Sequence, residues 1–371
     1  MKNEMKVSII TVTYNAAETI EKTITSVLVQ SYKNIEYIIV DGISTDGTWE
    51  KICKYKNQIH KIIHERDNGL YDAMNKGISL VTGDIIGIIN GDDWYETDAV
   101  ENVVNAFRNN VDVIYGDMRV IGDNDSTGQI CDYVDMSDIW YSMIPHPTVF
   151  VKKHIYNKFG IFNLNYPIAS DYELILRFYT KGVRFQYINK VLANFRRGGL
   201  TTDKWFECAR EVKEVSMTYI EQCPEKDKYI KKVIERYNNM CMRAAYEQSD
   251  EVFKKNLDKV FHNKNNIFCI FGAGIWGNRC ARKLKNCGIE EFYFIDNDLK
   301  KQGKRIDGHE ILSPNRLQEM KCNLIIAVSS GYDEISRQIE ESGNNGIQWI
   351  AMFELFNEQE NNEYINDLIS V

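Results

Sequence analysis

The sequence lacks the long apolar segments of a membrane-spanning or exported chain. Runs without charged residues are short: Ile139–Val151 has 13 residues and contains two prolines, whereas a helix that crosses a bilayer needs roughly 20 apolar residues. The first residues, MKNEMKVSII, show no apolar segment before a small-residue cleavage site. We therefore expect a cytoplasmic protein without a secretory signal.

Paired cysteines and an excess of positive charge are also missing. The nine cysteines are odd in number and include no CxxC pair, which favours reduced thiols over a disulfide framework or a zinc cluster. A net charge of −8 argues against a general nucleic-acid binder, because neutralising phosphates requires clustered Lys and Arg. A local basic patch, and with it peripheral association with the inner face of a membrane, stays open.

What is present is the composition of a folded protein with two domains. The 371 residues are 44% hydrophobic and 26% charged, which is typical of globular chains of this length. In the first third, strand-like apolar runs alternate with amphipathic helical segments, which predicts an α/β fold with a mostly parallel sheet. The predicted strands are Lys6–Thr13, Ile35–Val40, Lys61–His64, Asp84–Asn90 and Val111–Tyr115.

Domain boundaries are predicted where this pattern changes. Residues 203–265 are charged and helical in pattern, and a new strand–helix alternation begins after them. The sequence thus predicts a first domain over residues 1–202, a helical connector over 203–265, and a second, smaller α/β domain over 266–371.

Acidic residues follow several predicted strands. Asp41 follows the second strand, Asp67 comes shortly after the third, and Asp92 and Asp93 directly follow the fourth. Ligands of open parallel sheets bind beyond the carboxyl ends of the strands, and carboxylates there are suited to a divalent cation that bridges to a diphosphate. Because Asp is also a common turn residue, Asp41 alone favours a turn, whereas the adjacent pair Asp92–Asp93 favours a ligand site.

These segments resemble the inverting glycosyltransferases of family 2, which have the GT-A fold. The resemblance implies a hexosyltransferase of polysaccharide biosynthesis that uses Mn²⁺ or Mg²⁺. Its donor would be a nucleotide sugar, a UDP-sugar or dTDP-sugar, and its acceptor a glycan or a lipid-linked glycan. The motifs occur in the family's order and spacing: VSIITVTYNAAETIEKTITSVLVQSY (7–32), IIVDGISTDGTWE (38–50), ERDNGLYDAMNKGISLVTGDIIGIINGDDWY (65–95), ASDYELILRF (169–178) and FRRGGLTT (195–202).

The resemblance also implies roles for single residues. Asp41 would accept a hydrogen bond from the ring N–H of a uracil or thymine. Asp92 and Asp93 would form the metal-binding DxD motif, with Asn90 at the position where relatives carry the first acid. Which of the two acids holds the metal and which contacts the ribose stays open. Around the nucleotide and its sugar, the resemblance places Thr13, Tyr14, Asn15, Arg66, Asp67 and Asn75.

Asp171 matches the catalytic base of the family. Sugar transfer with inversion needs one carboxylate that takes the proton from the acceptor hydroxyl. Asp171 also precedes the apolar helical residues Leu174, Ile175 and Phe178, so it is suited to cap that helix. The two roles are compatible, because a helix N-terminus favours an ionised carboxylate.

Three further residues have two interpretations each. Arg196 and Arg197 lie on a glycine-bearing turn after the predicted strand Gln186–Phe195, where they either bind the diphosphate or face solvent. His146, between two prolines, either lines the acceptor site or packs in a loop. Residues 122–136 are expected to influence the choice of acceptor.

A glycine-rich motif follows the first predicted strand of the second domain. Gly272, Gly274 and Gly277 form G-x-G-x-x-G after Asn266–Phe271, and Asp296 lies 19 residues beyond Gly277. This context is typical of a nucleotide-binding βαβ unit in which the acid contacts a ribose hydroxyl. The unit resembles small Rossmann-like modules attached to some sugar-modifying enzymes. It either binds a nucleotide or serves as a scaffold for assembly into a homo-oligomer.

Three functions therefore compete. The first is a metal-dependent glycosyltransferase in the first domain. The second is an NAD-linked oxidoreductase or epimerase in the second domain, although no Tyr-x-x-x-Lys base accompanies the glycine-rich motif. The third is a non-catalytic scaffold that binds nucleotide sugars. Diphosphate release from a nucleotide sugar would favour the first, and bound NAD the second.

Overall fold

The structure is a computed structural model that describes residues 5–107, 110–122, 129–131, 134–199, 203–260, 267–319, 324–329, 333–341 and 347–356. The chain divides into two units, Met1–Ile230 and Lys231–Val371. The predicted boundary at residue 202, much of the predicted acceptor segment 122–136, and the end of the predicted connector fall outside the described residues.

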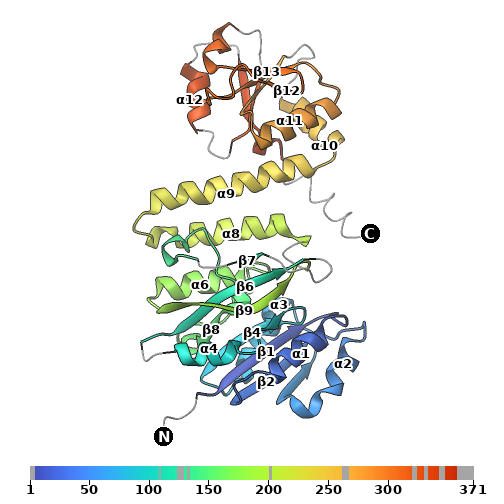
Figure 1. Ribbon diagram of the computed structural model, residues 1–371, viewed down its shortest axis with the longest axis vertical. Helices are drawn as coiled ribbons and strands as arrows, with labels where there is room; N and C mark the ends of the chain where they lie inside the picture. Colours follow the sequence, from blue (N-terminus) through green and yellow to red (C-terminus); the bar gives the residue numbers. More distant parts are fainter. Residues whose placement is uncertain are drawn as a thin grey trace. The chain divides into compact units, whose positions relative to one another are not determined.

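A nine-stranded sheet forms the centre of the first unit (Figure 1). Its order is β3-β2-β1-β4-β8-β6-β9-β5, with β7 paired to β6. The neighbours β3, β2, β1 and β4 are parallel, as are β6 and β9, whereas β8 and β5 run antiparallel to their neighbours. The predicted α/β fold with a mostly parallel sheet is confirmed. The strands are β1 Val7–Thr13, β2 Ile35–Asp41, β3 Lys61–His64, β4 Ile85–Asn90, β5 Trp94–Tyr95, β6 Val113–Ile121, β7 Ile130–Cys131, β8 Phe150–Lys152 and β9 Phe185–Arg196.

Alternating side chains of β1 build a core on each face of this sheet. Ile10 and Val12 join the core that α3, α5, α6 and α8 cover, and Val7 and Ile9 join the core under α1, α2 and α4. Because successive side chains of a strand point to opposite faces, a continuous β-branched run is what a strand buried on both faces requires. The helices are α1 Ile20–Leu28, α2 Thr48–Lys54, α3 Leu70–Leu80, α4 Ala99–Ala106, α5 Lys153–Phe159, α6 Ser170–Thr180 and α8 Trp205–Tyr219.

The helical stretch after residue 203 is divided between the two units. Helix α8 packs against α6 in the first unit, and α10 (Asp250–Val260) adds Phe253 and Leu257 to the core of the second. Helix α9 (Lys226–Glu247) contains the division point. No helix in the described part of the chain is both long enough and apolar enough to cross a membrane.

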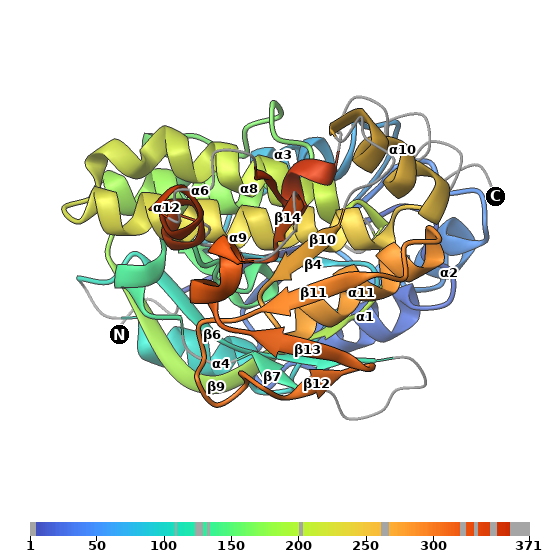
Figure 2. The ribbon, with the colours of Figure 1, turned by 90° about the horizontal axis from the view of Figure 1, so that it is seen from above.

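The second unit contains a six-stranded sheet in the order β12-β13-β11-β10-β14-β15 (Figure 2). All neighbours are parallel except β12 and β13. Helices α10 and α11 cover one face and α12 the other. The elements are β10 Phe268–Phe271, α11 Ile275–Asn286, β11 Phe292–Ile295, β12 Arg305–Ile306, β13 His309–Leu312, β14 Leu324–Ala327, α12 Asp333–Glu341 and β15 Gln348–Ala351.

A buried carboxylate lies at the amino-terminal edge of the first sheet. Glu36 accepts hydrogen bonds from the Ser8 hydroxyl at 2.5 Å and from the backbone N–H and hydroxyl of Thr82, both at 2.7 Å. The ammonium group of Lys6 lies 3.4 Å away. Burial raises the pKa of Glu36, but these hydrogen bonds and Lys6 outweigh burial and lower the pKa to about 2.

This low pKa predicts a pH-dependent contribution to stability. The carboxylate stabilises the fold fully above the unfolded-state pKa of roughly 4.3, and the contribution is lost as the pH falls toward 2. A shift of about two units corresponds to roughly 3 kcal/mol. We expect Glu36→Gln to lower the free energy of unfolding by about that amount at pH 7, and by progressively less at pH 4 and pH 3. Urea denaturation at each pH measures this difference, and the exposed Glu50→Gln serves as the control. A difference that does not change with pH would contradict the prediction.

Candidate functional site

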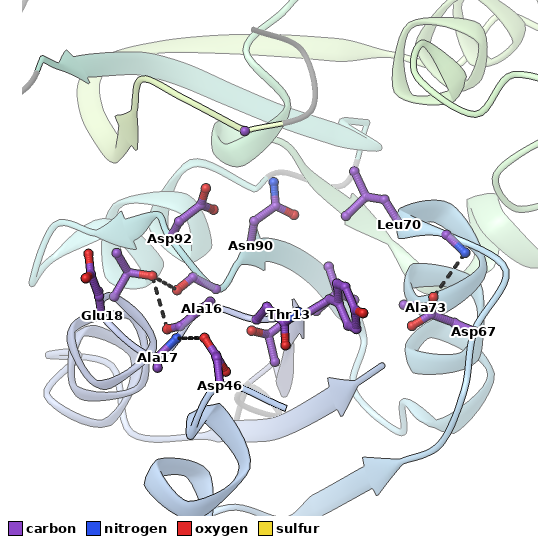
Figure 3. Close-up of a pocket in the computed structure, with 17 residues that line it drawn as sticks. Thr13, Ala16, Ala17, Glu18, Asp46, Asp67, Leu70, Ala73, Asn90 and Asp92 are labelled. Carbon is purple, nitrogen blue, oxygen red and sulfur yellow. Dashed lines mark hydrogen bonds between the residues drawn. The ribbon is translucent and has the colours of Figure 1, made fainter. Parts of the chain in front are cut away.

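The carboxyl ends of β1, β2 and β4 meet at one edge of the first sheet. In the strand register, Thr13 pairs with Asp41 and Val12 with Asn90. Two cavities open at this edge. The first has a volume of about 650 Å³ (Figure 3), and the second a volume of about 620 Å³. The cavities adjoin, because both are lined by Leu70, Asn90, Asp92 and Gly199.

The first cavity collects five of the residues predicted around a nucleotide. Thr13, Tyr14 and Asn15 line it from the end of β1, Asp67 from the loop before α3, and Asp92 from the turn after β4; Figure 3 labels Thr13, Asp67 and Asp92. The Tyr14 side chain is 64% exposed, so its ring is available for stacking. This wall is open and aromatic, which suits a base or ribose.

Asp46 also lines the first cavity and was not predicted. Its carboxylate accepts hydrogen bonds from the backbone N–H of Ala17 and from both donors of Thr48. Burial raises the pKa of Asp46, and these hydrogen bonds outweigh it and lower the pKa. In the sequence, Asp46 is indistinguishable from an ordinary turn residue.

Asp41 lies at the same edge but points into the protein. Its side chain is fully buried, and the Ser44 hydroxyl donates to one carboxylate oxygen at 2.5 Å. The other oxygen accepts from the backbone N–H of Ser44 at 3.1 Å and lies 2.6 Å from Nδ1 of His64. Within the described residues, Asp41 lines neither cavity. Its contact with a nucleobase stays a prediction.

The adjacent acids Asp92 and Asp93 face different environments. Asp92 lines both cavities; burial raises its pKa, and the positive charge of Arg196 opposes that shift. Asp93 is fully buried; its Oδ1 accepts a hydrogen bond from the backbone N–H of Arg196 at 3.0 Å, whereas its buried Oδ2 has no hydrogen-bond partner among the described residues. Burial raises the pKa of Asp93 well above its usual range, and the charge of Asp92 adds to the shift. In the described chain, only Asp92 of this pair lines a cavity.

Two residues that were predicted near the nucleotide and its sugar form hydrogen bonds elsewhere in the fold. The amide of Asn75 donates to the carbonyl of Phe162 at 2.9 Å and accepts from the N–H of the same residue at 3.0 Å. Arg66 is exposed, and its carbonyl accepts a hydrogen bond from Lys76. Among the described residues that line the two cavities, neither Asn75 nor Arg66 is present.

The glycine-bearing turn after β9 approaches Asp92. A β-carbon added at Gly199 would lie 3.7 Å from Asp92 Oδ2, and Gly198 lines the second cavity. The guanidinium group of Arg196 lies 5.7 Å from the ring centre of Trp94, and Arg197 is exposed. The turn backbone therefore reaches the cavities, while a contact of either arginine with a diphosphate stays a prediction.

Asp171 and His146 both line the second cavity. Asp171 is the second residue of α6 and the N-cap position belongs to Ala169; Asp171 Oδ1 nevertheless accepts a hydrogen bond from the backbone N–H of Tyr172 in the first turn at 2.9 Å. The Tyr71 hydroxyl lies 2.9 Å from Asp171 Oδ1 and 2.8 Å from the carbonyl oxygen of Ile168. Burial and the charge of Asp171 raise the pKa of Tyr71 well above its usual range, so its hydroxyl remains a donor. Burial lowers the pKa of His146, with the charge of Asp171 opposing the shift.

A buried carboxylate on α8 accepts hydrogen bonds from the backbone at the start of α6. Glu211, on α8, accepts hydrogen bonds from the backbone N–H groups of Ile168 and Ala169 at 2.9 and 2.8 Å. These donors lie at the N-terminus of α6, where a negative charge is stabilising. The segment that carries Asp171 is thus held from α3 by Tyr71 and from α8 by Glu211. No sequence motif marks Glu211, which lies 40 positions after Asp171 in a generally charged helix.

The glycine-rich turn of the second unit lies between β10 and α11. Gly272 has a φ of +117°, and a β-carbon at Gly277 would lie 1.9 Å from the carbonyl oxygen of Gly272, whereas one at Gly274 would meet nothing within 4 Å. Asp296 accepts hydrogen bonds from the Ala273 N–H at 2.7 Å and from Lys301 at 2.9 Å. Burial raises the pKa of Asp296, but these hydrogen bonds and Lys301 lower it overall. A contact of Asp296 with a ribose stays a prediction.

Two glycine substitutions separate folding from ligand binding in this turn. We expect Gly274→Val to leave the melting temperature of the protein unchanged and to abolish nucleotide binding, since the valine side chain would fill the space that phosphates approach. Gly277→Ala should lower the melting temperature, because its β-carbon would collide with the backbone. Calorimetric titration of the full chain with NAD and with CoA measures binding. If wild-type protein binds neither, or if Gly274→Val binds equally well, the phosphate-cradle hypothesis is wrong.

Comparisons with known proteins match both parts of the chain. A family model described as glycosyl transferase family 2 matches residues 8–164, and a second, described as C2185-like, N-terminal, matches residues 263–348. The UDP-Glc:alpha-D-GlcNAc-diphosphoundecaprenol beta-1,3-glucosyltransferase WfaP of Escherichia coli is 30% identical over 213 residues, which cover 55% of this chain and 83% of the relative.

Two solved structures share the fold. The S. aureus TarS fragment 1–349 in complex with UDP has a TM-score of 0.50 and 17% identity, covering 69% of this chain and 79% of that chain. The mannosyltransferase PcManGT from Pyrobaculum calidifontis, in complex with GDP-Man and Mn²⁺, has a TM-score of 0.50 and 17% identity, covering 67% and 77%. At such identities the likeness concerns the fold alone.

Proposed function

The chain belongs to glycosyltransferase family 2, and on that premise we propose that it transfers a sugar, with inversion, from a UDP-sugar to a glycan or lipid-linked acceptor. The observation that carries the proposal is the pair of adjoining cavities, which meet at Asp92 and hold Asp171 in the second. A donor in the first cavity and an acceptor in the second would bring the anomeric carbon and the acceptor hydroxyl together.

The donor and acceptor classes are inferred from relatives. The name of the E. coli relative specifies UDP-Glc as donor and a diphosphoundecaprenol-linked sugar as acceptor, and the TarS fragment was solved with UDP. The exposed ring of Tyr14 and the carboxylate of Asp67 in the first cavity are compatible with a nucleoside.

Asp92 and Asn90 fit a divalent cation at the border of the cavities. Asn90 Oδ1 is buried and accepts no hydrogen bond from any described residue, and Asp92 offers a carboxylate beside it. No group of three or more His, Cys, Asp or Glu side chains suited to a metal occurs in the described ranges, so donor oxygens and water would complete the coordination. When bound, Mn²⁺ or Mg²⁺ would neutralise the charge that develops on the departing diphosphate.

Asp171 would act as the base of the transfer. Its carboxylate takes the proton of the acceptor hydroxyl, and the acceptor oxygen bonds to the anomeric carbon on the face opposite the leaving group. The bond between that carbon and the phosphate oxygen breaks, and its electron pair leaves with the nucleoside diphosphate. The single proton of the Tyr71 hydroxyl lies within reach of Asp171 Oδ1 and of the carbonyl oxygen of Ile168, and when donated to Asp171 it would orient the carboxylate.

Removal of the Tyr71 hydroxyl tests this positioning role. In Tyr71→Phe the Asp171 carboxylate loses a hydrogen bond that orients it, so turnover should fall roughly 10-fold while the affinity for UDP stays unchanged. Tyr219→Phe is a matched control, because the Tyr219 hydroxyl also donates to a buried carboxylate, Glu173, at 2.5 Å. Unchanged turnover in Tyr71→Phe, or a fall in turnover accompanied by an equal loss of UDP affinity, would contradict the positioning role.

A screen of nucleotide sugars tests the proposed function. Purified protein is incubated with UDP-, dTDP- and GDP-sugars, with Mn²⁺, with Mg²⁺ or with EDTA, and release of nucleoside diphosphate is measured. We expect release from a UDP-sugar that EDTA prevents. Release from a GDP-sugar alone would overturn the donor assignment, and release that persists in EDTA would overturn the metal requirement.

A further inference from the structure

The wall of the second cavity is largely apolar. Met74 on α3, Met118 on β6, Ile130 on β7, Phe195 on β9, and Met143 and Ile144 before the 3₁₀ turn His146–Thr148 all line it. A cavity for a fully hydroxylated sugar would present hydrogen-bonding groups on most sides, because a buried hydroxyl without a partner loses stability. Here these apolar side chains form a large part of the lining, beside the polar groups of Tyr71, Asn90, Gln129 and His146.

The charged groups of the cavity are acidic. Asp171 and Asp92 line it, and among the described lining residues there is no Lys or Arg. Arg196 acts on Asp92 at the border with the first cavity, and Arg119, the neighbour of Met118 on β6, is paired with Glu96. Burial lowers the pKa of His146, so at neutral pH the imidazole supplies no full positive charge. A carboxylate on the acceptor sugar itself would therefore meet no Lys or Arg among the described residues that line this cavity.

We propose that the acceptor sugar held beside Asp171 is uncharged and carries an apolar substituent, such as the methyl group of an acetamido or a 6-deoxy sugar. This inference rests on the proposed function and specifies its acceptor class. The methyl group would contact the methionine and isoleucine side chains. A uronic acid would place a second carboxylate near Asp171, and the two like charges would repel each other.

Four octyl glycosides that differ only in the sugar test the proposal: an N-acetylglucosaminide, a 6-deoxyglucoside, a glucoside and a glucuronide. With the donor found in the screen, we expect kcat/KM for the two methyl-bearing acceptors to exceed that for the glucoside by about 10-fold, the usual effect of one buried methyl-sized group. The glucuronide should be at least roughly 100-fold worse than the N-acetylglucosaminide. Equal or better use of the glucuronide or the glucoside would overturn the inference.

Binding measurements keep the test decisive if none of the four is glycosylated. Saturation-transfer NMR with UDP present ranks the glycosides by affinity, and the same order is expected; absence of binding by all four would overturn the inference. Failure of the proposed function has a different signature, namely no diphosphate release from any nucleotide sugar. Normal donor hydrolysis with the reverse acceptor order would overturn only the acceptor class.

A lysine introduced into the apolar wall of the second cavity should alter the preference among the four acceptors. In Met118→Lys we expect the discrimination against the glucuronide to fall by at least about 10-fold, because the ammonium group can pair with the acid. Donor hydrolysis reports whether the variant is folded. Met217→Lys, on the exposed surface of α8 and outside both cavities in the described structure, should retain the wild-type preference. Unchanged discrimination in a folded Met118→Lys protein would count against a contact between this wall and the acceptor.

Discussion

Asp171→Asn is expected to lower turnover by roughly 10² to 10⁴ while donor binding persists. The amide keeps the volume of the side chain and an oxygen that can accept the hydrogen bond from Tyr71 at the position of Asp171 Oδ1, but it cannot take a proton from the acceptor. Because Asp171 lines the second cavity and not the first, the affinity for UDP should be nearly unchanged. Steady-state rates and calorimetric titration with UDP measure the two quantities separately.

A structural carboxylate provides the contrast for this variant. Asp112 is buried and accepts hydrogen bonds from the side chain and backbone N–H groups of Arg184, away from both cavities. Asp112→Asn should lower the melting temperature and leave the rate per folded molecule unchanged. If Asp171→Asn instead lowers the melting temperature and UDP affinity, its carboxylate serves to hold α6 and the base assignment is wrong.

Asp92→Ala is expected to abolish transfer and the metal dependence of UDP binding. Of the two adjacent acids, Asp92 lines both cavities, and a carboxylate is the ligand that a hard divalent cation requires there. UDP titrated with and without Mn²⁺ should give the same weak affinity in this variant, whereas wild-type protein should bind more tightly with the metal. Full activity of Asp92→Ala would contradict the assignment of Asp92 as a metal ligand.

Asp93→Asn distinguishes the two acids. The Asp93 carboxylate is buried against the backbone of Arg196, and burial raises its pKa well above the usual range, so an amide of the same shape should be tolerated. We expect this variant to retain the effect of Mn²⁺ on UDP affinity and to keep most of its turnover. Loss of the metal effect in Asp93→Asn, with the effect retained in Asp92→Ala, would reverse the assignment.

Local patterns in the sequence were sufficient to predict the fold class. The β-branched run Val7–Thr13 forms the central strand β1, and both of its faces are buried. Such runs alternate with amphipathic helices along the chain. A parallel sheet covered by helices on both faces buries the apolar side of every one of these elements. The short antiparallel strand β8, Phe150–Lys152, separates β4 from β6 in the sheet. Its three residues are too few to reveal either its direction or its place in the order.

The sequence by itself determined the family, the sheet edge that bears the cavities, and the identity of most acids at that edge, because these depend on residues close together in the chain. Only the tertiary structure decided which acids reach a cavity. Asp93 turns inward to the backbone of Arg196, 103 residues away, and Asp41 to Ser44 and His64. Glu211 reaches α6 from a helix that follows the matched family segment. Most of the donors that orient these carboxylates, such as the Arg196 N–H beside Asp93 and His64 beside Asp41, lie far away in the sequence, so the sequence alone does not show which way each carboxylate points.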